Sequence, residues 1–219
     1  MSRSSLTAPA TGFDPGCQAC PRLAGFLEDV RQEHPDYFAA PVPPFGDPAA
    51  RLLIVGLAPG MHGANRTGRP FTGDYAGLLL YRTLHRHGLA SAETSESADD
   101  GLRLRDIRIT NAVKCLPPQN KPNSKEINKC NQYLKYEIEN SHEVQAILAL
   151  GRIAHDSVLR ALDLRQSVAP FAHGAAHPLR PGLTLVDSYH CSRYNLNTGR
   201  LTEAMFDTAF RRFLECVRQ

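Results

Sequence analysis

Four short apolar runs along the chain predict the strands of a sheet. Each run is rich in Ile, Leu, Val or Ala, which is typical of strands that are buried on both faces of a parallel sheet. Helical spacing of apolar residues appears between and around these runs. The predicted strands are 51–56, 107–113, 144–150 and 183–187, and the predicted helices fall within 17–32, at 75–87, from about 124 to 140, after Gly151 and at 201–217. Strands that alternate with helices predict an α/β sandwich with a mainly parallel sheet.

Polar and glycine-rich loops follow three of the predicted strands. In open α/β sheets, ligands bind outside the carboxyl ends of the strands. The loops in question are 56–74, 111–122 and 187–199. We therefore expect any chemistry to lie in these loops. Segment 91–101 is predicted to be an acidic polar loop.

Composition narrows the class of protein. The chain has 219 residues, of which 42% are hydrophobic and 21% charged, so we expect one globular domain spanning 1–219, with residues 1–15 flexible. No apolar run approaches the roughly 20 residues of a membrane helix, and the start of the chain lacks the apolar core of a secretory signal. We therefore expect a cytoplasmic protein that does not enter the membrane. The net charge of +3 permits a nucleic-acid partner without implying one.

Six cysteines are unusual in a chain without an export signal, because disulfides are then improbable. Cys17 and Cys20 form a Cys-x-x-Cys pair, and Cys115 and Cys130 follow further along the chain. Four thiolates suit one metal centre, and the spacing leaves both zinc and a [4Fe–4S] cluster open. The alternative is four unrelated buried thiols.

The glycine-rich loop 56–74 does not match the common phosphate-binding motifs. Pro59 interrupts the turn of a dinucleotide fingerprint, and no Gly-Lys-Ser/Thr of a phosphate loop occurs. Its five glycines allow close backbone approach to a flat ligand or a phosphate. Phe71 is either an aromatic that stacks on a base or a core residue. Asn111 is either an amide that reads a pyrimidine edge or a residue that holds its loop.

The polar segment after the fourth predicted strand carries His190. A histidine there is able to act as a hydrogen-bond donor or general acid, although a loop histidine is often merely solvated. Ser192, Arg193 and Asn195 follow it closely. These three residue types commonly hold phosphates.

Together, these segments resemble the fifth family (type B) of uracil-DNA glycosylases. The run 56–74 resembles the first motif of that family, 110–122 resembles its asparagine segment, and 190–202 resembles its second motif. The four cysteines match the iron–sulfur ligands of the thermostable glycosylase families. The resemblance extends from Cys17 to the C-terminal helix.

The resemblance implies a fold and a cofactor. It implies a three-layer sandwich around a central four-stranded, mainly parallel sheet. It also implies a [4Fe–4S] cluster, rather than zinc, on Cys17, Cys20, Cys115 and Cys130, which would clip segment 17–40 onto the domain. The implied activity is removal of uracil from DNA, with hypoxanthine or other deaminated bases as further substrates. We expect a monomer.

Roles for individual residues follow from the same resemblance. His190 is expected to stabilise the leaving base, and Asp74 to position water, although Asp74 is also a plausible cap of the following helix. The substrate-binding residues are expected to be Gly56, Ala58, Gly60, Phe71 and Asn111. The DNA-binding residues are expected to be Asn65, Arg66, Ser192, Arg193 and Asn195.

Two other classes of protein stay open on the sequence. One is a non-catalytic nucleic-acid-binding module with a structural metal clamp. The other is a nucleotide hydrolase that uses the glycine-rich loop. No lysine is placed to form a Schiff base, so we expect no strand-cleaving lyase activity.

Overall fold

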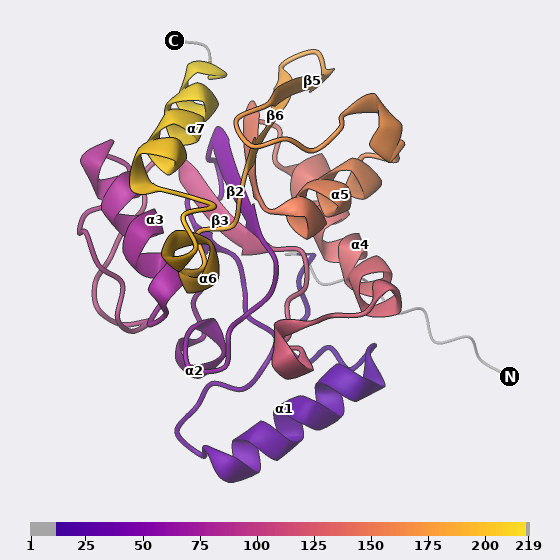
Figure 1. Cartoon of the computed structure of the whole chain (residues 1–219). Coiled ribbons are helices and arrows are strands. Elements are labelled where there is room, and N and C mark those ends of the chain that lie inside the picture. The colour runs from indigo at the N-terminus through magenta and orange to yellow at the C-terminus, as the bar shows by residue number, and fades with distance from the viewer. Residues whose placement is uncertain (1–11, 218–219) are drawn as a thin grey trace, which may run out of the picture.

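A mixed six-stranded sheet runs through the protein, with helices on both faces (Figure 1). The computed structural model describes residues 12–217, so the N-terminal segment predicted to be flexible lies largely outside the described residues. The strands are β1 (Phe45–Gly46), β2 (Leu52–Gly56), β3 (Ile107–Asn111), β4 (Ala146–Leu150), β5 (Ala176–Arg180) and β6 (Leu183–Ser188). Their order across the sheet is β1-β3-β2-β4-β6-β5.

The four central strands are the four that the apolar runs predict. β3, β2, β4 and β6 are mutually parallel, whereas β1 and β5 pair antiparallel at the two edges. The sheet is therefore two strands wider than expected. β1 has only two residues, and β5 contains Pro178 and lacks an apolar run, so neither edge strand has a local signal.

Helices on both faces complete the three layers. α3 (Tyr75–Arg86) and α7 (Glu203–Glu215) pack on one face, and α4 (Ser124–Asn140) and α5 (Arg152–Ala161) pack on the other. Alternate residues of β2 serve the two cores: Ile54 faces α3 and α7, whereas Leu53 and Val55 face α4 and α5. The predicted three-layer sandwich is confirmed.

Side-chain caps set where two of these helices begin. The Asp74 carboxylate accepts a hydrogen bond from the Gly77 amide at the start of α3. At the start of α4, Asn123 and Glu126 form a reciprocal capping box, so Asn123 rather than Ser124 is the cap. Two short helices that the sequence does not predict, α2 (Ala64–Thr67) and α6 (Arg193–Asn197), lie within the polar loops.

The N-terminal helix α1 (Pro21–Glu33) lies apart from the three layers, near α2 and the start of α4 (Figure 1). It buries Leu23, Leu27 and Val30 in a small separate core. The Arg22 guanidinium also makes a bidentate pair with the Glu126 carboxylate of α4, with N–O distances of 2.7 and 2.8 Å. This separate core contains Cys115 and Cys130, so the packing of α1 is linked to the cysteine site.

No helix among residues 12–217 is long and apolar enough to cross a membrane.

Candidate active site

A cavity of about 440 Å³ opens at the carboxyl ends of β2, β3 and β6. The parallel register aligns these ends, since Gly56 of β2 lies opposite Asn111 of β3. All three loops singled out in the sequence contribute to the wall. The predicted site residues that line the cavity are Ala58, Gly60, Phe71, Asp74, Asn111, His190, Ser192 and Arg193.

Gly56 lies beneath this cavity, and its lack of a side chain shapes the floor. A Cβ atom at this position would lie 2.4 Å from Asn111 Oδ1 and 2.6 Å from Phe71 Cζ, far inside contact distance. The bare backbone therefore lets the amide and the aromatic ring come together over the strand end.

Phe71 and His190 form one wall of the cavity. Their ring centroids are 6.0 Å apart and the planes are inclined by 27°. Phe71 is only 5% exposed and also belongs to the core between the sheet, α3 and α7. Both interpretations of this residue are therefore compatible with its position, because one edge of the buried ring meets the cavity.

Asn111 ends β3 and is 4% exposed. Its Oδ1 atom is buried and has no hydrogen-bond partner among the described residues. Leaving a buried polar atom without a partner costs free energy, so such an atom points to a ligand or a water molecule at the site.

His190 is half-buried, and burial lowers its pKa to about 4. At neutral pH the ring is therefore neutral, with one nitrogen that donates and one that accepts. The Asn195 side chain donates to the His190 carbonyl oxygen at 2.8 Å, and Cys191 anchors the next position because its side chain is fully buried. The hydrogen bond from Asn195 and the buried Cys191 side chain therefore both hold the backbone at His190 in place.

Asp74 is predicted either to position water or to cap the following helix. Its Oδ1 accepts the Gly77 amide at 2.8 Å, so the predicted capping role is confirmed. Burial raises the pKa of Asp74, although hydrogen bonds from the Gly77 and Ala76 amides act in the opposite direction. A carboxylate with a raised pKa is a better proton acceptor than a solvated one.

The predicted DNA-binding residues differ in how far their side chains are exposed. Arg193 is exposed at the cavity rim with its guanidinium 4.9 Å from the centre of the Tyr75 ring, and Arg66 donates to the His62 carbonyl oxygen at 2.8 Å. Asn65 is fully buried and neither of its amide atoms has a partner among the described residues, so its side chain does not face a DNA surface.

Ser192 and Asn195 both have partners within the protein. The Ser192 hydroxyl caps α6 by accepting the Asn195 amide, while the Asn195 side chain holds the His190 carbonyl. Both residues therefore stabilise the conformation of the segment that contains His190.

A buried polar cluster supports the strand that leads to His190. The Asp187 carboxylate of β6 lies 2.6 Å from His155 Nδ1 and 3.2 Å from His177 Nε2, and accepts the Ala172 amide. His155 Nε2 contacts the Ala169 carbonyl oxygen at 2.8 Å. These contacts tie segment 169–177 to the end of β6. No local pattern marks either histidine in the sequence, because the cluster joins residues that are far apart along the chain.

Asn120 and Tyr75 also line the cavity and were missed. Asn120 has a φ of 56°, and it follows Gln119 in the same left-handed region. Asparagine tolerates that region better than most residues, so the Gln-Asn pair within a proline-rich loop was an available signal for a special turn.

The four predicted metal-ligating cysteines line one narrow pocket between α1 and α4. Burial, together with the neighbouring thiols Cys130, Cys17 and Cys20, raises the pKa of Cys115 to about 12. The Lys114 amide donates to Cys130 Sγ at 3.2 Å. Thiols that raise one another's pKa lie close together, and a positive centre between them would relieve that repulsion.

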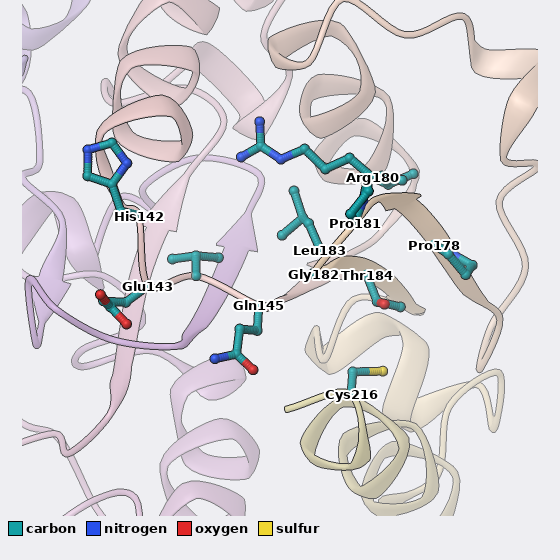
Figure 2. Close-up of a pocket in the computed structure, with 12 residues that line it drawn as sticks. His142, Glu143, Gln145, Pro178, Arg180, Pro181, Gly182, Leu183, Thr184 and Cys216 are labelled. Atoms are coloured by element: carbon teal, nitrogen blue, oxygen red, sulfur yellow. The ribbon is translucent and has the colours of Figure 1, made fainter. Parts of the chain in front are cut away.

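A second cavity, of about 690 Å³, lies at the opposite end of the sheet (Figure 2). It is bordered by the amino ends of β4 and β6, and its labelled side chains include Glu143, Gln145, Thr184 and Cys216. Cys216 is half-buried at this wall. No predicted site residue reaches this cavity, so volume alone does not locate the site.

Comparisons with known proteins indicate one superfamily. A family model described as the uracil DNA glycosylase superfamily matches residues 43–214. The chain is 50% identical over 197 residues to a type-5 uracil-DNA glycosylase of Thermus thermophilus, covering 87% of this chain and 89% of that protein. It is 47% identical over 203 residues to a type-5 uracil-DNA glycosylase of Mycobacterium leprae, covering 89% of each. A type-4 uracil-DNA glycosylase of Archaeoglobus fulgidus is 36% identical over 124 residues, 56% of this chain and 54% of that protein.

A three-layer α/β fold with Phe71, Asn111 and His190 around one cavity, together with these matches, places the chain in the uracil-DNA glycosylase superfamily. Identities of 47–50% over most of the chain narrow this further, and the chain belongs to the type-5 family. The resemblance noted in the sequence is confirmed.

The lowered pKa of His190 gives a first prediction. The ring should titrate near pH 4 in the folded protein, well below the ordinary value of 6.5. The unfolded chain takes up this proton first as the pH falls. The His190 contribution to stability should therefore be intact above about pH 6.5 and be lost as the pH falls from there toward 4. A histidine NMR titration, with His190→Asn to assign the signal, measures the value. A His190 pKa of 6 or above would contradict the buried, neutral ring.

Proposed function

We propose that this protein is a uracil-DNA glycosylase that flips uracil out of DNA and hydrolyses its N-glycosidic bond, leaving an abasic site. The observation that carries the proposal is one cavity in which the unpartnered Asn111 Oδ1, the Phe71 ring and neutral His190 converge. The type-5 relatives bear the name of this activity. A non-catalytic module would have no use for such a combination.

Base recognition begins with flipping. Extruding a base costs a few kcal/mol, and less when the base is mispaired or deaminated, so damaged positions are favoured. In the cavity, the base would stack on Phe71 over the backbone of Gly56, Ala58 and Gly60. The Asn111 amide offers both an acceptor and donors, which matches the mixed donor and acceptor edge of uracil.

His190 supplies the main catalytic interaction in this proposal. As the glycosidic bond breaks, negative charge develops on the carbonyl oxygen of the leaving base. The neutral imidazole donates its N–H to that oxygen. Because the charge exists only in the transition state, the donor accelerates the reaction rather than tightening ground-state binding. One such donor is worth about 2.7–4 kcal/mol in comparable sites.

Asp74 is the proposed water-positioning group. If bond breaking precedes water attack, the sugar becomes oxocarbenium-like and a weak base suffices. The carboxylate is able to serve the helix and the water together, because Oδ1 binds the Gly77 amide while Oδ2 lies on the Gly60 side, 3.8 Å from where a Cβ of Gly60 would stand.

Contacts to the DNA strand are proposed for the cavity rim. Arg193 and Arg66 supply positive charge for phosphates on either side of the flipped nucleotide. Ser192, at the N-cap of α6, and Asn195, within α6, complete the rim in this proposal.

We propose that Cys17, Cys20, Cys115 and Cys130 hold a [4Fe–4S] cluster, which would clip segment 17–40 onto a single domain spanning 1–219. The four cysteines line one pocket, and the neighbouring thiols raise the pKa of Cys115. A donor set of four thiolates suits such a cluster. The cluster is structural in this proposal, and no catalytic step passes through it.

The cavity volume of about 440 Å³ supports acceptance of larger deaminated bases such as hypoxanthine. We also propose that the enzyme is a monofunctional, cytoplasmic monomer.

Excision of uracil tests the proposed function directly. The protein should release uracil from a uracil-containing oligonucleotide, detected as cleavage in alkali. His190→Ala and Asn111→Ala should each slow excision by about 10²–10³-fold, the loss expected for one donor aimed at developing charge. His142→Ala, at the opposite end of the sheet, is the matched control and should keep the full rate. A parent protein without excision would refute the function, and full rates in both variants would refute the residue assignment.

Asp74→Asn separates the two roles of Asp74. Asparagine caps helices about as well as aspartate, so the free energy of unfolding should change little. The single-turnover rate should fall by about 10²-fold or more, as for loss of a general base, while DNA binding stays near the parent value. Denaturant titration and excision kinetics provide the two readouts. An unchanged rate would leave Asp74 with the capping role alone.

The cluster predicts a brown protein with iron and acid-labile sulfide in equal amounts, about four of each per chain. Cys115→Ser should lose both, because it removes a proposed ligand. Cys216→Ser, at the C-cap of α7, should retain them. Elemental analysis that finds stoichiometric zinc and no iron in the parent protein would overturn the assignment.

A further inference from the structure

The backbone of Phe71 adopts a conformation that aromatic residues rarely take. Its φ is +55°, in the left-handed region, where a bulky side chain is strained. Strain of this kind persists only where the surroundings determine the conformation, and it concentrates at functional sites. The question is which groups hold Phe71 there.

Hydrogen bonds hold the residue on each side of Phe71. The Tyr81 hydroxyl of α3 donates to the Pro70 carbonyl oxygen at 2.8 Å. The Thr72 hydroxyl lies 2.9 Å from Arg69 Nε, which donates to it. The Phe71 carbonyl rests on α3 at Gly77, where a Cβ would lie 1.8 Å from the carbonyl oxygen.

Arg69 is the centre of this arrangement and is only 4% exposed. Besides Thr72, its guanidinium donates to the Ser95 hydroxyl at 2.6 Å and to the Asp100 carboxylate at 2.5 Å. The Ser95 carbonyl also accepts the Gly73 amide at 3.0 Å. The buried Arg69 guanidinium therefore connects the Phe71 segment to Ser95 and Asp100, about thirty positions away in sequence.

The acidic loop 91–101 is largely exposed, but its residue Ser95 is buried. Asp100 folds it by accepting the amides of Glu96 and Leu102, each at 2.9 Å. This fold brings Ser95 and Asp100 against Arg69. The guanidinium of Arg69 meets these three partners at once with N–H donors held in a fixed planar geometry.

We propose that Arg69, Ser95 and Asp100 are positioning residues that lock Phe71 in its left-handed conformation and so hold its ring at the wall of the base pocket. The inference rests on the proposed function for its effect on excision. The positioning itself is a statement about the free protein. Loop 91–101 thereby becomes part of the machinery for base recognition, although it does not line the cavity.

The test compares two arginine–aspartate pairs in the full-length protein. Asp100→Asn removes the charge that orients Arg69 and should lower kcat/KM for uracil excision by up to about 100-fold, the effect of a roughly 1 Å misplacement at a site. Asp106→Asn is the matched control. Asp106 also pairs with an arginine, Arg51 Nε at 2.8 Å, but at the amino ends of β2 and β3. This control should keep kcat/KM even if it lowers stability.

A double-mutant cycle and a spectroscopic readout separate positioning from general destabilisation. Asp100→Asn should add little to the defect of Phe71→Ala, because both act through the same ring. The His190 ring signals should shift in Asp100→Asn and not in Asp106→Asn, since the Phe71 ring lies 6.0 Å from the His190 ring. If Asp100→Asn does not fold, Ser95→Ala serves in its place.

Parent-like kcat/KM with unmoved His190 signals in Asp100→Asn, or fully additive defects with Phe71→Ala, would overturn the proposal. If the parent protein excises nothing, the proposed function fails, and the His190 signals alone then decide whether Arg69 and Asp100 position Phe71.

Discussion

The missing side chain at Gly56 is the constraint on which the pocket depends. Strand register fixes Asn111 directly opposite Gly56, and the loop after β2 turns back so that the Phe71 ring covers the same strand end. Any Cβ at Gly56 would collide with both. In the proposed complex a flat base would lie between the amide and the aromatic ring, and that arrangement needs this close approach and bare backbone at the end of β2.

Burial then sets the electrostatics of the pocket. It lowers the pKa of His190 and raises the pKa of Asp74, so both groups shift toward their neutral forms. In the proposed mechanism, negative charge appears on the leaving base only as the glycosidic bond breaks. A neutral His190 imidazole that is already in position would stabilise this charge without having to reorient, because the site is desolvated and its dipoles are fixed. The permanent positive charge of Arg193 lies at the rim of the cavity, and Arg66 is exposed on α2.

Local patterns predicted the central strands and the three loops that line the cavity, because each of these is a contiguous stretch of sequence. The buried strands are unbroken apolar runs, and Asp74 and Asn123 are cap residues next to helical periodicity. The edge strands escaped prediction, since two residues at Phe45–Gly46 and a proline-containing β5 depend on pairing with neighbours. The Arg69 network and the Asp187 cluster also escaped it, because each joins segments that meet only after folding. The burial of Asn65 also escaped prediction, because it too depends on segments that meet only after folding.

The most direct test of the account is the structure of the protein bound to DNA that carries a non-hydrolysable 2′-deoxyuridine analogue. The account predicts an extruded uracil stacked on Phe71, with its edge on the Asn111 amide and a carbonyl oxygen within hydrogen-bond distance of His190. A uracil that remains in the duplex, or one that occupies the cavity with Asn111 and His190 both turned away from it, would contradict the account.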